Sequence, residues 1–308
     1  MKTEKNKTDK KKSFGLLITG AALLVIGIIF AVYAYHSSYQ DSVALGTQLK
    51  SVKAQVSAIK EGTASGDLDA LNAQVSRLSA DKLSKERPYS YGLTLVFFSI
   101  LLTVKGIYNA LIGVYKPEKA DVKKLAQAGL LAALCYIGFA FFKIDIPVGP
   151  EKASFHFGNV FCVLAALLLG GYWGGLAGAV GMTIGDFTTS YVTSAPKTFL
   201  LKLCIGLIVG LVAHVIFKLS QDHSARFVTG VTILASACGM GFNVVADPLV
   251  GYFYKTYLFG VPQDITTALV KISALTTSVN AVVAVIAASA IYLALRPALK
   301  KSGLFVEP

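Results

Sequence analysis

The stretch "LLLGGYWGGLAGAVG", residues 167–181, lies between two apolar runs, and six of its fifteen residues are glycine. Such a density of small residues lets helices approach closely, and it tolerates a break in a helix whose backbone is buried in protein. We therefore expect two spans, residues 160–172 and 174–190, to be joined here and to be tightly packed or bent.

Further apolar runs extend outward from this stretch in both directions. Runs of about 18 apolar residues reach across a bilayer, and the chain is 54% hydrophobic and only 15% charged. We predict an all-α integral membrane protein with a six-helix transmembrane bundle over residues 125–299, preceded by two transmembrane helices. The remaining expected spans are residues 14–35, 91–115, 125–142, 198–218, 227–250 and 266–295.

The N-terminal region, residues 14–115, holds the first two spans. The basic tail 1–13 followed by the run 14–35 superficially resembles a signal peptide. The run is too long and no small-residue cleavage site follows it, so we expect a retained anchor.

Between these anchors, at about residues 40–87, two apolar seams have 3-4-3 spacing. They predict an extracytoplasmic antiparallel helical hairpin, with a turn at "EGTASGD" and Asp67 as N-cap. A flexible amphipathic spacer is the alternative, because such short helices are marginal in water. The seams are Leu49, Val52, Val56, Ile59 and Leu68, Leu71, Val75, Leu78.

The net charge of +12 could suggest nucleic acid as a partner. The basic residues are concentrated in short segments between spans, including the linker 116–124, as the positive-inside rule requires. We therefore expect no nucleic-acid partner, a lipid bilayer around the chain, and both termini in the cytoplasm. Three polar loops then fall outside: "KIDIPVGPEKASFHFGN", "YVTSAP" and "YKTYLFGVPQD".

Motifs for catalysis or metal binding are missing from the sequence. The four cysteines lie in apolar runs without CxxC spacing, which favours core packing over a disulfide or a zinc site. The four histidines are scattered, and HExxH, GxSxG and GxxxxGK[ST] are absent. We expect no metal, no cofactor, no enzymatic activity and no ATPase of its own.

Three ionisable residues stand close together in the apolar half: Asp186, Lys197 and Lys202. Charge at membrane depth costs several kcal/mol, roughly, unless it is paired or faces water. One interpretation is a buried ion pair of Asp186 with Lys197 or Lys202 that fixes two helices. The other is that these residues line a polar pocket that opens to the outside.

Polar groups at the outer ends of other spans favour the pocket. Alternating the spans across the bilayer gathers them at one membrane face, where they suit a flat ligand that is anionic or bears carbonyl groups. The tyrosines of "GYFYKTY" could instead form an interfacial belt, and Asn280 could be a hydrogen bond between helices. The candidate substrate-binding residues are Asn159, Asp186, Tyr191, Lys197, Lys202, Asn243, Asp247, Tyr252 and Lys271.

Ala128 and Ala132 lie one turn apart in a small-residue face of the span 125–142. Small residues at this spacing let another helix dock closely. The partner could be another subunit or, with equal weight, a helix of this chain.

Together these motifs resemble the S component of energy-coupling-factor (ECF) vitamin transporters, over about residues 122–299. The similarity is strongest in "LAALLLGGYWGGLAGAVGMTIGDFTTSYVTSAPKTFLLKLCIGLIVGLVAH" and in "GYFYKTYLFG". It implies a bundle that binds its ligand near the extracellular face, under loops one, three and five. It also implies a bacterial plasma membrane, a transmembrane coupling subunit contacted by an alanine motif like that of Ala128 and Ala132, and two ATPases.

The resemblance predicts an importer subunit that captures a small water-soluble vitamin or precursor and delivers it inward. Pyridoxine-like, pyrimidine-like and pterin-like compounds all fit. The last span departs from the family pattern with "VKISALTTSVN", and residues 1–115 have no counterpart in the usual subunit. We suggest that their hairpin is an outer lid or an assembly element.

Two other functions compete with this one. An independent secondary transporter usually carries related halves, and no internal repeat is seen among the six spans. A membrane sensor would need a cytoplasmic output domain, whereas only short basic connectors are present.

Overall fold

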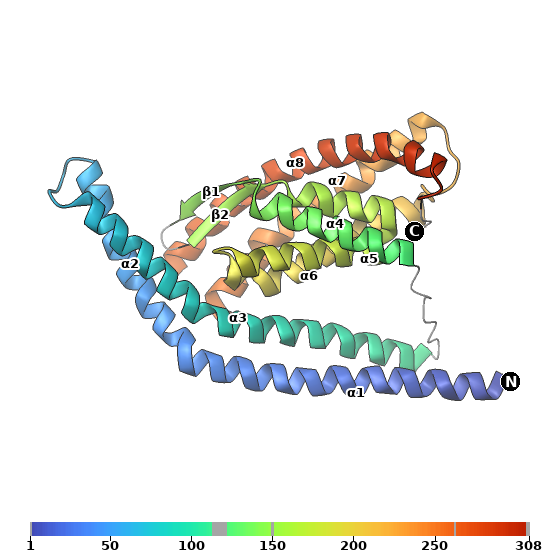
Figure 1. Ribbon diagram of the computed structural model, residues 1–308, viewed down its shortest axis with the longest axis horizontal. Helices are drawn as coiled ribbons and strands as arrows, with labels where there is room; N and C mark the ends of the chain where they lie inside the picture. The colour runs from blue at the N-terminus through green and yellow to red at the C-terminus, as the bar shows by residue number, and fades with distance from the viewer. Residues whose placement is uncertain (1, 113–121, 149–150, 262, 306–308) are drawn as a thin grey trace. The chain divides into compact units, whose positions relative to one another are not determined.

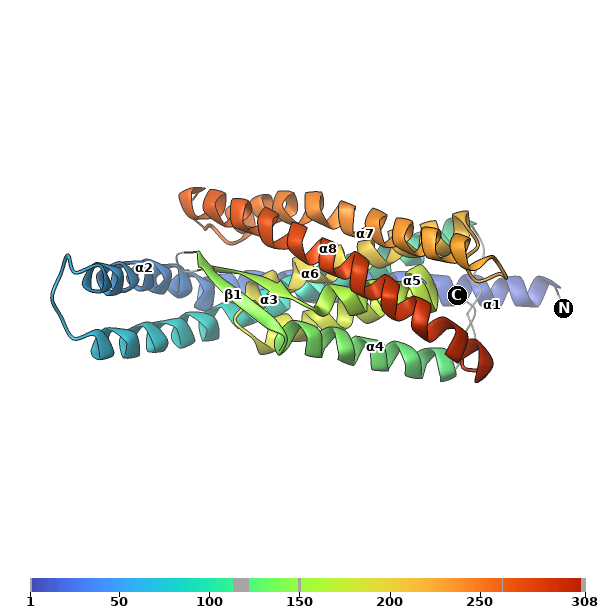
Figure 2. The ribbon, with the colours of Figure 1, turned by 90° about the horizontal axis from the view of Figure 1, so that it is seen from above.

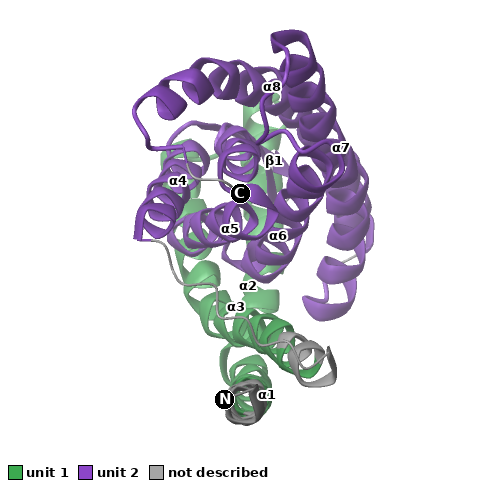
Figure 3. Ribbon diagram, turned by 90° about the vertical axis from the view of Figure 1, so that its right-hand side faces the viewer, with its two compact units in different colours: residues 1–120 green, residues 121–308 purple. Residues whose placement is uncertain are grey.

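The computed structural model describes residues 2–112, 122–148, 151–261 and 263–305, and they are nearly all helical (Figure 1). Six helices among these residues are long and apolar enough to cross a membrane. The predicted fold class, an all-α membrane protein, is confirmed. The chain divides into two compact units, Met1–Ala120 and Asp121–Pro308, which are coloured separately in Figure 3.

Unit 1 is built from two long helical segments that pack side by side. α1 (Lys2–Ala34) continues through a π-helical turn (Tyr35–Tyr39) into α2 (Gln40–Lys60), and α3 (Leu68–Ile112) runs back along both. A Cβ atom added to Gly92 would lie 2.8 Å from the Ala31 Cα, and one on Gly106 would lie 2.8 Å from the Leu17 Cα. Glycine therefore sets the close approach of α1 and α3.

The turn between α2 and α3 forms where the sequence predicts it. Asp67 Oδ1 accepts hydrogen bonds from the N–H groups of Asp69 and Ala70, both at 3.0 Å, and so caps α3. Leu49 and Val52 are buried between the two helices. α3 continues without a break into the expected second anchor, whose residues 113–115 lie outside the described residues.

The described residues of unit 2 form five helices and a two-stranded sheet, which Figure 2 shows from above. Short π-helical or 3-10 turns extend α6 at both ends and α7 at its C-terminal end. The elements are α4 (Val122–Ala140), β1 (Lys143–Val148), β2 (Glu151–His156), α5 (Gly158–Thr188), α6 (Ala195–Gly210), α7 (Ala225–Phe253) and α8 (Gln263–Lys301).

α5 is two helical arms folded back on each other. Gly170 has φ 81° and ψ 174°, a conformation outside the helix. A Cβ atom on Gly174 would lie 2.3 Å from the Ala166 Cα, and one on Gly178 would lie 2.3 Å from the Cys162 Sγ. In a straight helix residues eight and sixteen apart are separated by about 12 and 24 Å. The two arms correspond to the expected spans 160–172 and 174–190, so unit 2 is a six-helix bundle.

The core of the bundle surrounds α5, whose side chains are mostly buried. A Cβ on Gly206 would lie 2.2 Å from the Gly175 Cα, so α6 is in backbone contact with α5. Cys135 and Cys162 are fully buried in this core, whereas Cys238 is exposed. Cys238 therefore departs from the expectation that all four cysteines are core residues.

The segment after α4 forms a β-hairpin, where the sequence suggested only a polar loop. β1 and β2 pair antiparallel, with Ile144 opposite Phe155 and Ile146 opposite Ala153. Val148 and Ala153 pack with Leu269 of α8. The alternation of apolar and polar residues in "KIDIPV" is the strand pattern that explains this hairpin.

Candidate functional site

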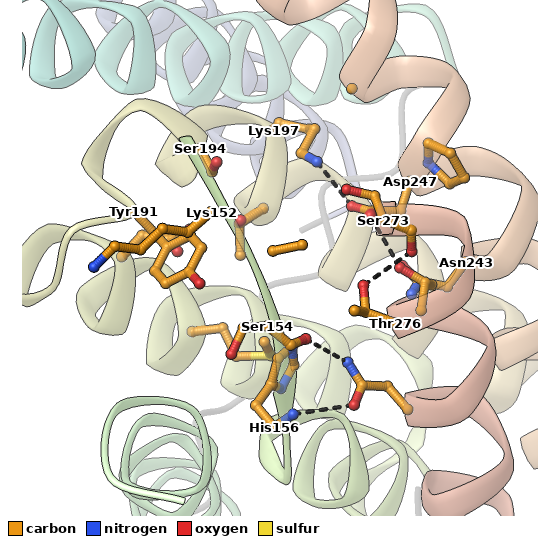
Figure 4. Close-up of a pocket in the computed structure, with 18 of the residues that line it drawn as sticks. Lys152, Ser154, His156, Tyr191, Ser194, Lys197, Asn243, Asp247, Ser273 and Thr276 are labelled. Carbon is orange, nitrogen blue, oxygen red and sulfur yellow. Dashed lines mark hydrogen bonds and ion pairs between the residues drawn. The ribbon is translucent and has the colours of Figure 1, made fainter. Parts of the chain in front are cut away.

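A polar cavity lies within unit 2, between β2, α5, α6, α7 and α8 (Figure 4). It encloses about 840 Å³ of empty space, part of it continuous with solvent. Its polar lining residues are Lys152, Ser154, His156, Asn159, Asp186, Tyr191, Ser194, Lys197, Thr198, Lys202, Asn243, Asp247, Lys255, Ser273, Thr276, Thr277 and Asn280.

Helical periodicity explains which side chains face this cavity. On α7 the lining residues Asn243, Asp247 and Gly251 are four apart, and therefore lie on one face. On α8 the segment "SALTTSVN", residues 273–280, contributes its first, fourth, fifth and eighth residues. This is the spacing of one helix face. α6 begins beside the cavity because Pro196 favours the first turn of a helix.

Lys197 and Asp247 form an ion pair in which both carboxylate oxygens of Asp247 have a partner. The Lys197 Nζ lies 2.9 Å from Asp247 Oδ1, and Asp247 Oδ2 accepts a hydrogen bond from the Thr277 hydroxyl at 3.2 Å. The pair connects α6, α7 and α8. Asp186 forms no ion pair within 4.0 Å in the described part of the chain, so the suggested pairing with Lys197 or Lys202 is wrong.

Deeper polar groups in the cavity are less completely bonded. Lys202 is 6% exposed, and its Nζ donates one long hydrogen bond, 3.5 Å, to Asn243 Oδ1. Asn159 Oδ1 and Asp186 Oδ2 are buried without a hydrogen-bond partner among the described residues. Buried polar groups left unmatched in this way cost stability, so the cavity has bonding capacity for a ligand.

At the edge of the cavity, Tyr191 is held by the β-hairpin. Its hydroxyl donates to Asp145 Oδ1 at 2.9 Å, and the Lys143 Nζ lies 4.8 Å from the centre of its ring. Burial, followed by the neighbouring Asp145 carboxylate, raises the pKa of the Tyr191 phenol above its ordinary value. The phenol therefore remains a hydrogen-bond donor at neutral pH.

Asn280 binds the hairpin to α8. Its Nδ2 donates to the Ser154 carbonyl at 3.1 Å, and its Oδ1 accepts from the His156 backbone N–H at 3.0 Å (Figure 4). The sequence allowed Asn280 to bond a neighbouring helix, but the partner is the β2 backbone. The hairpin is thereby fixed as one wall of the cavity.

His156 contributes a neutral imidazole to the same wall. Burial, and then the charge of Lys202, lowers the pKa of His156 to about 3. Its Nδ1 atom is buried and has no hydrogen-bond partner in the described ranges. His156 was not predicted in the site, because its position depends on the unexpected hairpin.

Two of the expected substrate-binding residues, Tyr252 and Lys271, do not line the cavity. The Tyr252 hydroxyl accepts a hydrogen bond from Gln263 Nε2 at 3.1 Å, and Lys271 is exposed. Tyr252 follows the lining residue Gly251 by one position, which turns it about 100° around the helix. Lys271 precedes Ser273 by two positions, about 200° away, and so lies on the opposite face of α8.

The other seven expected residues do line one cavity: Asn159, Asp186, Tyr191, Lys197, Lys202, Asn243 and Asp247. The sequence-based set omitted lining residues on β2 and α8, including Ser154, Thr276 and Thr277. Those on α8 share the i, i+3, i+4, i+7 spacing described above, which the sequence already contained. The described residues include no group of three or more potential ligands that could hold a metal ion.

Ala128 and Ala132 face the interior of the bundle. Ala128 is 7% exposed, and Ala132 packs against the core. A Cβ atom on Gly181 would lie 2.1 Å from the Ala132 carbonyl oxygen. The second arm of α5 therefore packs on this face. This agrees with the alternative that a helix of the same chain is the partner of Ala128 and Ala132.

Comparison with known proteins places the cavity-bearing unit in a family. Residues 119–297, more than half of the chain, match the family described as "ECF-type riboflavin transporter, S component". An "Uncharacterized protein in gap 3'region" of Pyrococcus woesei is 29% identical over 108 residues, which make up 35% of this chain and 69% of that protein. No solved structure matches.

Proposed function

The chain belongs to the ECF-type riboflavin transporter S component family, and we propose that it captures a small vitamin at the extracellular face and hands it inward to an ATPase-driven coupling module. The observation that carries this proposal is the polar cavity, which gathers lining residues from four helices and the β-hairpin.

The cargo we propose is a flat, polar vitamin, with riboflavin as the first probe because the family description names it. The lining combines many hydrogen-bonding groups with the aromatic rings of Phe139 and Tyr191, whose centres lie 5.7 Å apart. Aromatic rings provide apolar contact area for a flat ligand, and the polar groups fix its orientation.

The partners we propose are a transmembrane coupling subunit and two ATPase subunits, since the sequence has no P-loop motif of its own. The basic connectors support a plasma-membrane protein with both termini in the cytoplasm. With Ala128 and Ala132 turned inward, we place the docking face on the exposed side of α4, which carries Ala126, Gly129 and Ala133. A Cβ atom on Gly129 would meet nothing within 4 Å, so this face has room for a close helix.

Equilibrium binding to the full chain in detergent tests the proposal. Riboflavin, pyridoxine, thiamine and a pterin are titrated against the unmodified protein, Lys202→Met and Lys271→Met. Lys202 lies in the cavity and Lys271 is exposed outside it, so the two variants lose the same charge in different places. We expect at least one vitamin to saturate the protein. Lys202→Met should lower the affinity for this vitamin about tenfold or more, because a hydrogen bond to a charged group is lost. Lys271→Met should lower it less than twofold.

Two results would contradict the proposal. One is the absence of saturable binding for every vitamin tested. The other is an equal effect of the two lysine variants, which would place binding outside the cavity. Retained elution volume and unfolding temperature of each variant show that a loss of binding is not a loss of folding.

A further inference from the structure

We propose that the α5 wall of the cavity selects cargo by its hydrogen-bond donors, through an acceptor pair made by Asn159 Oδ1 and Asp186 Oδ2. The bound molecule would turn an N–H or O–H edge, and not a carboxylate, toward α5. This inference rests on the proposed capture function and specifies the chemistry of its cargo.

The fold of α5 brings the two acceptors to one end of the bundle. Asn159 is the second residue of α5 and Asp186 is near its end, and the break at Gly170 returns the second arm along the first. The contacts of Gly174 with Ala166, Gly178 with Cys162 and Gly158 with Met182 set the register of the arms.

This register places Asn159 near the level of Met182, whose side chain also lines the cavity. Asp186 follows Met182 by four residues, which is about one helical turn or roughly 5–6 Å. The two acceptors therefore lie at the same end of α5, one on each arm, and a ligand with donors toward both arms could meet them.

Both side chains are buried and unmatched. Each residue is 1% exposed, and Asn159 Oδ1 and Asp186 Oδ2 have no hydrogen-bond partner among the residues that the structure describes. The Thr198 side chain lies close enough to Asp186 to hydrogen-bond it. An unmatched acceptor at this depth lowers the stability of the protein, and a donor from the cargo would offset that loss.

The side-chain oxygens of the other acidic and amide residues in the cavity do have hydrogen-bond partners. Both oxygens of Asp247 are bonded, to Lys197 and Thr277. Both ends of Asn280 bond β2, and Asn243 Oδ1 accepts from Lys202. Free acceptor capacity among these groups is therefore concentrated on α5.

Two substitutions test the acceptor pair in the full chain. Asp186→Asn can replace the unmatched acceptor by a donor in nearly the same shape, and Asn159→Leu removes the amide at similar size. Thr188→Val is the matched control, because Thr188 is exposed at the same end of α5 and bonds only its own helix. Each protein is titrated with the same four vitamins, and 3-methylriboflavin is added as a riboflavin probe whose ring N–H is blocked.

We expect Asp186→Asn and Asn159→Leu each to lower the affinity for the tightest-binding vitamin tenfold or more. The affinity of Thr188→Val should stay within twofold of that of the unmodified protein. If riboflavin is the tightest vitamin, the unmodified protein should also prefer it to 3-methylriboflavin. The unfolding temperature of Asp186→Asn should be retained or raised, because an amide has no ionised form for burial to penalise.

Vitamin binding that Asp186→Asn and Asn159→Leu leave unchanged would overturn the acceptor pair, and would mean that water alone satisfies these oxygens; the capture function would stand. If no vitamin binds the unmodified protein, the capture function fails and the acceptor pair fails with it. The two failures are thus told apart by the unmodified protein.

Discussion

Polar side chains in the cavity fall into two groups according to what satisfies them. Lys197, Asp247 and Thr277 bond one another and tie three helices together. Asn159, Asp186 and Lys202 retain bonding capacity. The first group is satisfied within the protein, and under the proposed capture function the second group binds cargo.

His156 gives a prediction of how stability depends on pH. Its pKa is lowered to about 3 in the folded protein, whereas an unfolded histidine titrates near 6.5. Below pH 6.5 the unfolded chain takes up a proton that the folded chain does not. Stability is therefore lost as the pH falls from 6.5 toward 3, by about 2 kcal/mol at pH 5.

Thermal unfolding at pH 7.5 and pH 5 measures this effect. His156→Gln should lose less stability on acidification than the unmodified protein, because it removes the titrating group. His223→Gln, which alters an exposed histidine, should behave like the unmodified protein. An equal acid loss in all three proteins would contradict the buried, neutral state of His156.

For single site residues, the sequence predicts the membrane face on which they lie but not the direction in which their side chains point. Alternating the spans places Asn159, Asp186 and Asn243 at one membrane face, and all three line the cavity. Topology does not fix the rotation of each helix. Tyr252 and Lys271 belong to α7 and α8 but do not line the cavity. The spacing of the polar residues in "SALTTSVN" indicates which face of α8 does.

At the scale of elements, the break in α5 is the feature that makes a six-helix bundle. Gly170 has φ 81° and ψ 174°, a region that only glycine adopts readily. Gly170→Ala should therefore destabilise the protein by about 1–3 kcal/mol. Gly129→Ala is the control, because Gly129 is helical and a Cβ there meets nothing within 4 Å.

Unfolding temperatures in detergent compare the two alanine variants. Gly129→Ala should be neutral or stabilising, by about 0.5–1 kcal/mol, since alanine is the better helix former. If Gly170→Ala were as stable as Gly129→Ala, the strained turn between the arms would be excluded.

The β-hairpin depends on one side chain of α8. Asn280→Ala removes both bonds to β2, to the Ser154 carbonyl and the His156 N–H. Two hydrogen bonds of about 1 kcal/mol each correspond to faster opening by about tenfold or more. Hydrogen exchange of the β2 amides should accelerate accordingly, and bound vitamin should dissociate faster.

Ser278→Ala is the control for Asn280, because the Ser278 hydroxyl bonds only the Ala274 carbonyl of its own helix. Unchanged exchange of the β2 amides in Asn280→Ala would show that other contacts hold the hairpin. The hairpin was missed in the sequence because each strand has only six residues. The helices were predicted because a membrane-length run is a much longer pattern.

At the scale of the whole molecule, the proposed vitamin site lies in one compact unit and the N-terminal extension, residues 1–115, lies in the other. Every residue that lines the cavity belongs to Asp121–Pro308. We therefore expect a chain that begins at residue 116 to bind vitamin with unchanged affinity in detergent.

If the N-terminal hairpin is a lid or an assembly element, the same truncation lowers vitamin uptake by cells or recovery of the complex. Unchanged uptake and unchanged complex formation would dismiss that role, and weaker binding in detergent would contradict the assignment of the site to unit 2.

Native mass spectrometry of the full chain, purified in detergent from cells supplied with vitamins, tests the central claim most directly. The account predicts one small polar molecule bound per chain, and its loss in Ser273→Trp, whose added ring would fill the cavity beside α8. The exposed substitution Lys271→Trp should retain the molecule. Lipid alone on the unmodified chain, or a small molecule retained equally by both tryptophan variants, would contradict the claim that this cavity captures cargo.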